Sequence, residues 1–186
     1  IEHPFNIGEL VMGAQGTFFA RVPDNDITLM TEAMFEAAKH DGTSIIEILQ
    51  NCIIFADKAH FNVIGKEVRD DTMCIVRNGQ PMLFGKNKDK GLRLNGTEIE
   101  VVELGQNGIT IDDILVHDRY NPEPWIHVML AKLAPPQFPM VFGVIRSAMF
   151  PTYDDLVEDK IQTGQKESPI RKMDHLLKSG ETWEIK

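Results

Sequence analysis

The chain has 186 residues, of which 42% are hydrophobic and 25% charged, and its formal net charge is -9. This composition is typical of a soluble globular protein with one sizeable core or two small ones. The negative charge repels phosphates and argues against nucleic acid as the main partner. No apolar run reaches the roughly 18 residues that span a bilayer, and no basic-then-apolar leader opens the sequence. We therefore expect a cytoplasmic protein without a membrane partner.

The cysteine content indicates the redox state of the chain, and its first residue indicates how the chain is produced. Cys52 and Cys74 are the only cysteines, too few for a disulfide framework, so we expect reduced thiols. The sequence begins at Ile1 without an initiator methionine and leads directly into helical signals. We interpret it as a fragment or a processed chain.

Capping and turn signals divide the first forty residues into helix, strand and helix. Asn6 is placed to cap a short helix over residues 7–15, and a buried strand is predicted over residues 17–22. Residues 23–26 end that strand and cap a second helix, which Asp41 and Gly42 close. The apolar face predicted for the second helix consists of Ile27, Met30, Met34 and Ala38.

A second strand, over residues 43–49, completes a predicted βαβ unit. The run is rich in β-branched residues and almost continuously apolar, which is typical of a strand covered on both faces. Strand, helix and strand in this order predict a parallel pair. Ligands of such sheets gather at the carboxyl edge of the strands, where Gln50, Asn51 and Cys52 follow the second strand.

Two Asn-Gly pairs predict two β-hairpins in the middle of the chain. The first pair, residues 78–79, lies within residues 72–84, and the second, residues 95–96, lies within residues 91–104. Asn-Gly readily supplies the two positive φ angles of a type I′ turn. A β-rich insertion is therefore expected after Cys52.

Helices and one extended segment are predicted for the remainder. Thr110 and Asp113 match a capping box for a short helix, and a further helix is predicted over residues 124–133. Prolines on both sides favour an extended chain over residues 138–144. Two helices are predicted in the tail. Thr152 with Asp155 can cap the first, while Ser168 followed by Pro169 opens the second and Gly180 follows its last turn.

Cys52 is the best candidate for a residue that carries chemistry. It follows a buried strand at the edge where ligands gather, so its thiolate could face a cofactor. One thiolate cannot hold a cubane iron–sulfur cluster, which normally uses four cysteines, so any other ligands must lie elsewhere. The pattern by itself favours a buried, unreactive cysteine. Cys74 alternates with Val76 in a predicted strand and is interpreted as ordinary packing.

Neither the histidines nor the basic residues form a specific motif. The six histidines are scattered, and no pair has the spacing of a zinc-binding helix. The dense basic cluster Lys86, Lys88, Lys90 and Arg93 lies between the two predicted hairpins. A solvated turn explains it, and docking of an acidic protein or a phosphate is the alternative.

Three runs of the sequence resemble the beta subunit of 2-oxoacid:ferredoxin oxidoreductases. They are IEHPFN (residues 1–6), GAQGTFFAR (residues 13–21) and EILQNCIIF (residues 47–55). The likeness is dense over the first 55 residues and continues more loosely through the predicted hairpins to residues 138–144 and 151–153.

The resemblance implies an α/β fold with two parts. Residues 1–55 would be the carboxyl-terminal part of the thiamine-diphosphate-binding domain, with a βαβ of a parallel sheet. Residues 56–186 would be the beta subunit's carboxyl-terminal domain, with hairpins and terminal helices. In the family, the missing amino-terminal half carries the diphosphate- and magnesium-binding motif and three cluster cysteines. The fourth cysteine of the 4Fe–4S cluster falls on Cys52, which is therefore the one metal ligand expected here.

The activity implied for the complete enzyme is oxidative decarboxylation of a 2-oxoacid to acyl-CoA with reduction of ferredoxin. The Gln50-Asn51-Cys52 context, with Ile54 and Phe55, resembles the 2-oxoglutarate branch. Implied partners are the amino-terminal half of the same subunit, the alpha subunit, ferredoxin, the 2-oxoacid and coenzyme A. Thiamine diphosphate, magnesium and the cluster belong to the complete enzyme, and we expect this chain alone to bind none of them and to be inactive.

Two other functions remain open at this point. The chain could be a non-catalytic module for subunit assembly or ferredoxin docking through the basic residues 86–93. It could also belong to a thiamine-diphosphate enzyme of the acetolactate-synthase type, which predicts a flavin or no redox centre.

Overall fold

The computed structural model describes residues 4–181, 183 and 185. Ile1, Glu2 and His3, which open the first run of the resemblance, lie outside the described residues. The chain divides into two compact units, Ile1–Phe150 and Pro151–Lys186. Cys52, Cys74 and the basic cluster all lie in the first unit, so this unit contains every candidate site.

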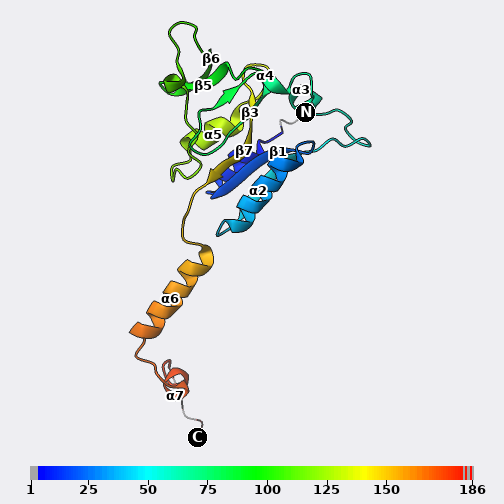
Figure 1. Ribbon diagram of the computed structural model, residues 1–186. Coiled ribbons are helices and arrows are strands. Elements are labelled where there is room, and N and C mark those ends of the chain that lie inside the picture. Colours follow the sequence, from blue (N-terminus) through cyan, green and yellow to red (C-terminus); the bar gives the residue numbers. More distant parts are fainter. Residues whose placement is uncertain (1–3, 182, 184, 186) are drawn as a thin grey trace. The chain divides into compact units, whose positions relative to one another are not determined.

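A four-stranded sheet lies at the centre of the first unit (Figure 1). Its strands follow the order β2 (Ser44–Leu49), β1 (Phe18–Pro23), β7 (Met140–Ser147) and β3 (Met73–Ile75). β1 and β2 are parallel and joined by α2 (Ile27–Lys39), so the predicted βαβ unit is confirmed. β7 pairs antiparallel with β1 and parallel with β3, and this confirms an α/β fold with a parallel-containing sheet.

α2 covers one face of this sheet through a narrow apolar stripe. Its buried residues are Leu29 and Ala33, which cluster with Phe18 of β1. The predicted face is wrong at Ile27, Met34 and Ala38, whose side chains are exposed. The predicted stripe and the observed stripe both have helical spacing. The observed stripe packs on the sheet because the small side chain of Ala33 allows the helix to approach closely.

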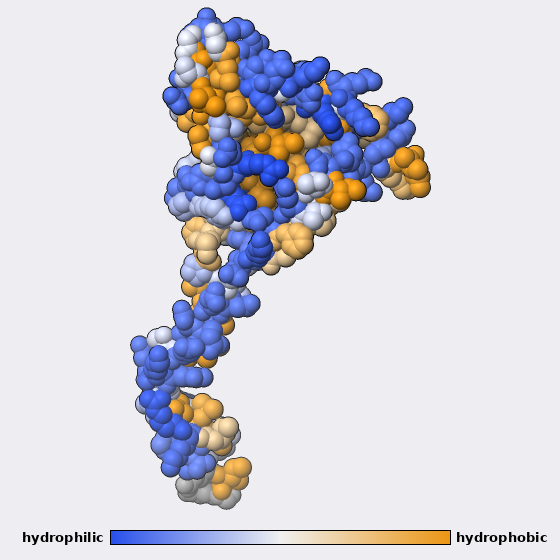
Figure 2. All heavy atoms as spheres, in the orientation of Figure 1, coloured by the Kyte–Doolittle hydropathy of each residue, from blue (hydrophilic) through white to orange (hydrophobic). Residues whose placement is uncertain are grey.

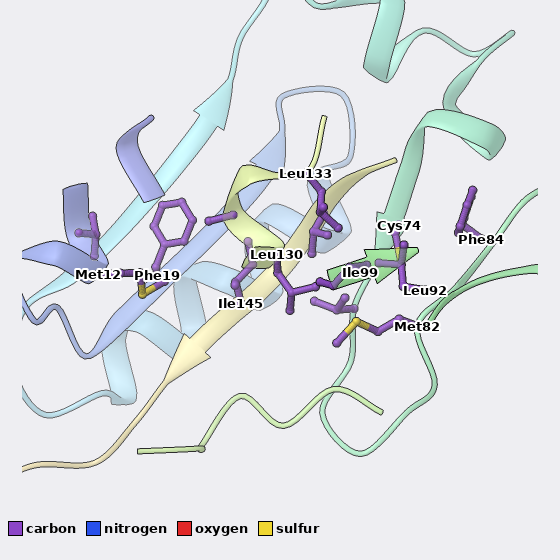
Figure 3. Packing of buried hydrophobic residues seen from close by; sticks show 14 residues of the cluster. Met12, Phe19, Cys74, Met82, Phe84, Leu92, Ile99, Leu130, Leu133 and Ile145 are labelled. Atoms are coloured by element: carbon purple, nitrogen blue, oxygen red, sulfur yellow. The ribbon is translucent and has the colours of Figure 1, made fainter. Parts of the chain in front are cut away.

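Two helices, α1 (Ile7–Gly13) and α5 (Trp125–Lys132), cover the opposite face. Figure 3 shows side chains of both helices gathered around Phe19 of β1. A Cβ atom at Gly8 would lie 2.7 Å from the Cβ of Ala131, so glycine is what permits this contact between the helices. The central sheet is thus covered by helices on both sides.

Helix caps predicted from the sequence are present where expected. The side-chain oxygens of Asn6 and Asp26 accept hydrogen bonds from the backbone N–H groups of Glu9 (3.1 Å) and Leu29 (2.9 Å). These bonds satisfy backbone donors that the first turn of a helix leaves free. α1 ends at Gly13, two residues earlier than predicted.

The β-rich insertion forms a second, three-stranded antiparallel sheet. Its strands are β4 (Leu83–Phe84), β5 (Lys90–Asn95) and β6 (Glu98–Glu103), in that order. The hairpin predicted at residues 95–96 is confirmed, because Asn95 pairs with Glu98 and Gly96 has a φ of +62°. Side chains of β5 and β6 join the cluster around α1 and α5, so the second sheet shares the core on this face of the central sheet (Figure 3).

The hairpin predicted at residues 78–79 is wrong. β3 pairs with β7 and β4 pairs with β5, so the segments on either side of this turn do not pair with each other. The N–H of Gly79 donates to the carbonyl of His117 (2.7 Å), and the side chain of Asn78 accepts from the N–H of Arg119 (3.0 Å). The Asn-Gly pair still forms a turn, but its hydrogen-bond partners are His117 and Arg119, which come later in the chain.

Three short helical segments complete the first unit. They are α3 (Phe61–Ile64), α4 (Arg69–Thr72) and the 3-10 helix η1 (Ile111–Asp113). The capping box predicted between Thr110 and Asp113 is confirmed at the start of η1. The helix predicted over residues 124–133 is also confirmed, with one residue fewer at each end.

The second unit consists of α6 (Tyr153–Glu167) and α7 (Met173–Leu177). The capping box of Thr152 and Asp155 is confirmed at the start of α6. The start predicted at Ser168 is wrong, since this residue ends α6 and α7 begins at Met173. None of the described helices combines the length and the apolarity that crossing a membrane requires.

Candidate functional site

Hydrogen bonds between the ends of two parallel strands position Cys52. The N–H of Asp24, just after β1, donates to the carbonyl of Leu49 at the end of β2 (3.1 Å). The carboxylate of Asp24 accepts in turn from the N–H of Asn51 (2.8 Å). These bonds fix the chain as it leaves β2, so Cys52 lies at the carboxyl edge of the βαβ unit, as predicted.

A tight turn follows Cys52 and brings the chain back beside it. The N–H of Ala56 donates to the carbonyl of Cys52 (2.9 Å). The side chain of Asn51 closes a wider loop: its oxygen accepts from the N–H of Lys58 (2.7 Å) and its nitrogen donates to the carboxylate of Asp57 (3.2 Å). The side chain of Asn51 therefore joins the start of the loop that carries the thiol to its end at Asp57 and Lys58.

The electrostatics of the turn lower the pKa of the Cys52 thiol. Hydrogen bonds from the backbone N–H groups of Phe55 and then Ile54 lower the pKa of this partly exposed thiol below its ordinary value. A thiolate is the form that binds metals and attacks electrophiles. The geometry thus suits a metal ligand or a reactive thiol.

The turn also presents an unusually apolar outer surface. Ile53, Ile54 and Phe55 are all exposed, although each has a large hydrophobic side chain. Figure 2 shows hydrophobic surface at the end of the loop that projects from the first unit after β2. Exposed apolar clusters of this kind mark interaction surfaces.

Cys52 can supply only one corner of a metal cluster. Within residues 4–181, 183 and 185, no three His, Cys, Asp or Glu side chains are grouped so that they could hold a metal ion. The donor chemistry at Cys52 nevertheless fits an iron–sulfur cluster, because cluster cysteines are thiolates and hydrogen bonds to the sulfur set the reduction potential.

Cys74 lies in an environment of the opposite kind. It occupies the middle of β3, its side chain is fully buried, and burial raises the pKa of its thiol to about 12. The interpretation of Cys74 as a packing residue is confirmed.

The basic cluster is partly neutralised by acidic neighbours. Lys90 forms an ion pair with Asp71 (2.8 Å), and Arg93 forms one with Glu100. Lys86 and Lys88, in the turn before β5, make no ion pair with any residue that the structure describes. Two lysines therefore remain available for a partner at this turn.

Sequence reasoning missed a buried polar network at the end of the central sheet. Arg146 of β7 is buried, and its guanidinium donates to the carbonyls of Asn121 (2.9 Å) and Pro122 (2.8 Å). It also contacts Nδ1 of buried His127 at 3.0 Å. Desolvation lowers the pKa of His127 to about 4, so this ring is neutral and accepts from the guanidinium. The sequence signal that could have revealed this network is Arg146 itself, a charged residue in the otherwise apolar run of β7.

A comparison with known proteins finds a relative that matches the whole chain. The chain is 32% identical over 188 aligned residues to the 2-oxoglutarate oxidoreductase subunit KorB of Mycobacterium tuberculosis. The alignment covers all of this chain and 50% of KorB, so the chain spans about half the length of that relative. No protein-family model and no solved structure matches the chain. The resemblance predicted from the sequence is confirmed by this similarity.

Proposed function

We propose that this chain is the carboxyl-terminal part of the beta subunit of a 2-oxoacid:ferredoxin oxidoreductase that acts on 2-oxoglutarate. The observation that carries the proposal is the similarity to KorB along the entire chain. The complete enzyme would convert the 2-oxoacid to acyl-CoA and reduce ferredoxin. Thiamine diphosphate, magnesium and a 4Fe–4S cluster supply the decarboxylation and electron-transfer chemistry when bound.

Within this enzyme Cys52 serves as one ligand of the 4Fe–4S cluster. Its position at the carboxyl edge of β2 and the lowered pKa of its thiol support this role. The N–H groups of Phe55 and Ile54 stabilise the negative charge of the sulfur, and such hydrogen bonds raise a cluster's reduction potential. This chain therefore contributes a thiolate and its stabilising amides.

The remaining parts of the catalytic machinery come from outside this chain. Three further cysteines and the diphosphate site belong to the amino-terminal half of the same subunit, by the family resemblance. The alpha subunit, ferredoxin, the 2-oxoacid and coenzyme A complete the set of partners. Because the chain holds one of four cluster ligands, it is inactive by itself.

Substitution of Cys52 in the full-length subunit tests this role. We expect Cys52→Ala to lose cluster iron and 2-oxoglutarate-dependent reduction of ferredoxin. Cys74→Ala is the matched control, because it removes a thiol that is buried in packing, and it should retain the iron. A Cys52→Ala enzyme with normal iron content and ferredoxin reduction would show that the ligand assignment is wrong.

A second candidate function is docking of ferredoxin or another acidic partner at the turn before β5. The observation in its favour is that Lys86 and Lys88 are exposed and unpaired among the described residues, whereas Lys90 and Arg93 have acidic partners. Exposed lysines steer acidic proteins through long-range attraction, which salt screens. The double variant Lys86→Glu, Lys88→Glu should slow ferredoxin association at low salt, and an unchanged rate rejects this surface.

A further inference from the structure

The chain contains three Asn-Gly pairs, at residues 78–79, 95–96 and 107–108. Asparagine is thermolabile, and a following glycine makes it more so, because glycine has no side chain to hinder attack of its backbone nitrogen on the asparagine side chain. The attack closes a succinimide ring. It requires that the glycine nitrogen is free and that the asparagine can rotate toward it. The three pairs differ in how far the structure allows this.

The pair at residues 78–79 is held at both reacting groups. The N–H of Gly79 donates to the carbonyl of His117 (2.7 Å). The side-chain oxygen of Asn78 accepts from the N–H of Arg119 (3.0 Å). Both hydrogen bonds have to open before the nitrogen of Gly79 can reach the side-chain carbon of Asn78. The structure therefore protects this pair.

The pair at residues 95–96 combines a free nitrogen with a fixed asparagine. The N–H of Gly96 has no backbone acceptor within the part of the chain that the structure describes. Asn95, however, is the last residue of β5 and pairs with Glu98 of β6, and its side-chain nitrogen lies 3.5 Å from the carboxylate of Glu100. Rotation of Asn95 would break the end of this ladder, so the pair is only partly protected.

The pair at residues 107–108 meets both requirements. It lies in the exposed turn between β6 and η1, and a hydrogen bond from the N–H of Ile109 to the carbonyl of Gln106 (2.9 Å) closes this turn. Asn107 and Gly108 both have left-handed φ angles, +49° and +78°. Among residues 4–181, 183 and 185, no hydrogen bond reaches the side chain or carbonyl of Asn107 or the N–H of Gly108. The peptide bond between them is free to rotate.

We propose that Asn107 is the principal site of spontaneous deamidation in this chain. The backbone nitrogen of Gly108 loses its proton and bonds to Cγ of Asn107. The bond from Cγ to Nδ2 breaks, and Nδ2 leaves as ammonia with the proton that it takes up. Water then adds to one of the two ring carbonyls and breaks that carbon–nitrogen bond, which leaves aspartate or isoaspartate. Water is the only co-reactant, and no atom is oxidised or reduced.

The position of the turn determines what the modification changes. The N–H of Leu104 donates to the carbonyl of Asp89 (2.8 Å), and Glu103 pairs with Lys90. The turn that carries Asn107 and the lysine-bearing turn before β5 therefore leave the second sheet at the same end. Deamidation adds a negative charge at this end and, where the product is isoaspartate, lengthens the backbone of the turn.

Mass spectrometry of the full-length, assembled subunit, incubated at mildly alkaline pH, tests the proposal. Trypsin and a Glu-specific protease together place the three asparagines in different peptides, and electron-transfer fragmentation identifies isoaspartate. We expect Asn107 to convert on the order of 10-fold faster than Asn78, because opening two hydrogen bonds reduces the reactive population of Asn78 by about that factor. Asn95 should convert at an intermediate rate. Equal rates at Asn107 and Asn78, or the fastest rate at Asn95, would overturn the inference.

The same subunit unfolded in urea is the control for sequence effects. All three asparagines precede a glycine, so their conversion rates should converge once the hydrogen bonds and the ladder are lost. If the order of the three rates is the same in urea as in the folded subunit, the neighbouring residues rather than the structure set it, and the structural argument is wrong.

A pair of glutamine variants gives a test on the whole protein. Glutamine keeps the amide but has one more methylene group, which disfavours ring closure. An isoaspartyl methyltransferase with labelled S-adenosylmethionine reports the isoaspartate content of the aged subunit. Asn107→Gln should lose most of the label, whereas Asn95→Gln should retain most of it. An Asn107→Gln subunit that is labelled like the unsubstituted one would show that the site lies elsewhere.

Discussion

The two cysteines of this chain show how strongly the local backbone determines the chemistry of a thiol. Cys74 lies within β3, where burial raises the pKa of its thiol to about 12. Cys52 lies in the turn after β2, where backbone N–H groups lower the pKa of its thiol. The same side chain is thus a small hydrophobic residue in one place and a candidate metal ligand in the other.

The difference arises from burial at Cys74 and from neighbouring backbone N–H groups at Cys52. β3 pairs with β7, and the side chain of Cys74 is fully buried there, which removes its thiol from water. The turn from Cys52 to Ala56 has one backbone hydrogen bond between its ends, and this leaves the amides of Ile54 and Phe55 free to bind the sulfur. Tight turns can therefore lower the pKa of a thiol without a basic side chain.

The largest expected consequence is a difference in alkylation rate between the two thiols. At pH 7, in the cluster-free chain, we expect iodoacetamide to modify Cys52 at least on the order of 1000-fold faster than Cys74, because only a thiolate reacts and Cys74 is buried. Mass spectrometry of timed samples measures both rates. Comparable rates would show that Cys74 is accessible and would remove the contrast.

The pH dependence of this reaction checks the lowered pKa. The rate at Cys52 should rise with pH, because deprotonation produces the reactive thiolate. It should reach half its maximum below pH 9.0, the ordinary value for a thiol, since the pKa of Cys52 lies below it. A midpoint at or above pH 9.0 would contradict the role of the amides.

A stability difference is the next largest effect. Cys74→Ser places a hydroxyl in an apolar site and should lower the free energy of unfolding by about 1–3 kcal/mol. Cys52→Ser lies in a partly exposed turn and should change that free energy by less than about 0.5 kcal/mol. Urea unfolding of both variants measures the two values, and equal losses would show that Cys52 is also a packing residue.

The sequence predicted Cys52's position for a physical reason. Asp26 caps α2 by a local interaction, and the strands on either side are nearly continuous apolar runs, so the βαβ unit could be predicted from short-range signals. The partners of the turn at Asn78 could not be predicted in the same way, because His117 and Arg119 are distant in sequence. Local signals determine the elements, and long-range contacts determine their pairing.

The polar details of the site were also beyond sequence reasoning. The pattern placed Asn51 next to Cys52 but did not show that its side chain closes the loop on Lys58 and Asp57. It did not show either that the amides of Ile54 and Phe55 lower the pKa of the thiol. Such bonds depend on loop torsions, which carry no periodicity to detect.

A substitution at Asn51 should weaken the contrast between the thiols by loosening the turn. Asn51→Ala removes the side-chain bonds to Lys58 and Asp57, so the amides should bind the sulfur less regularly and the pKa of Cys52 should rise. The pH profile of alkylation measures this change. Asn95→Ala, in the β5–β6 turn, is the control and should leave the profile unchanged.

The smallest and most specific effect concerns one backbone N–H group. Phe55→Pro removes the first of the amides that lower the pKa of Cys52, whereas Phe55→Ala removes the exposed ring and keeps the amide. The pKa of Cys52, measured from the alkylation profile, should therefore rise in the proline variant and stay unchanged in the alanine variant. In the full-length enzyme, the proline variant should also lower the reduction potential of the cluster, since a hydrogen bond to its ligand is lost. If both variants behave alike, the ring rather than the amide controls the thiol, and the contrast with Cys74 would then rest on solvent exposure.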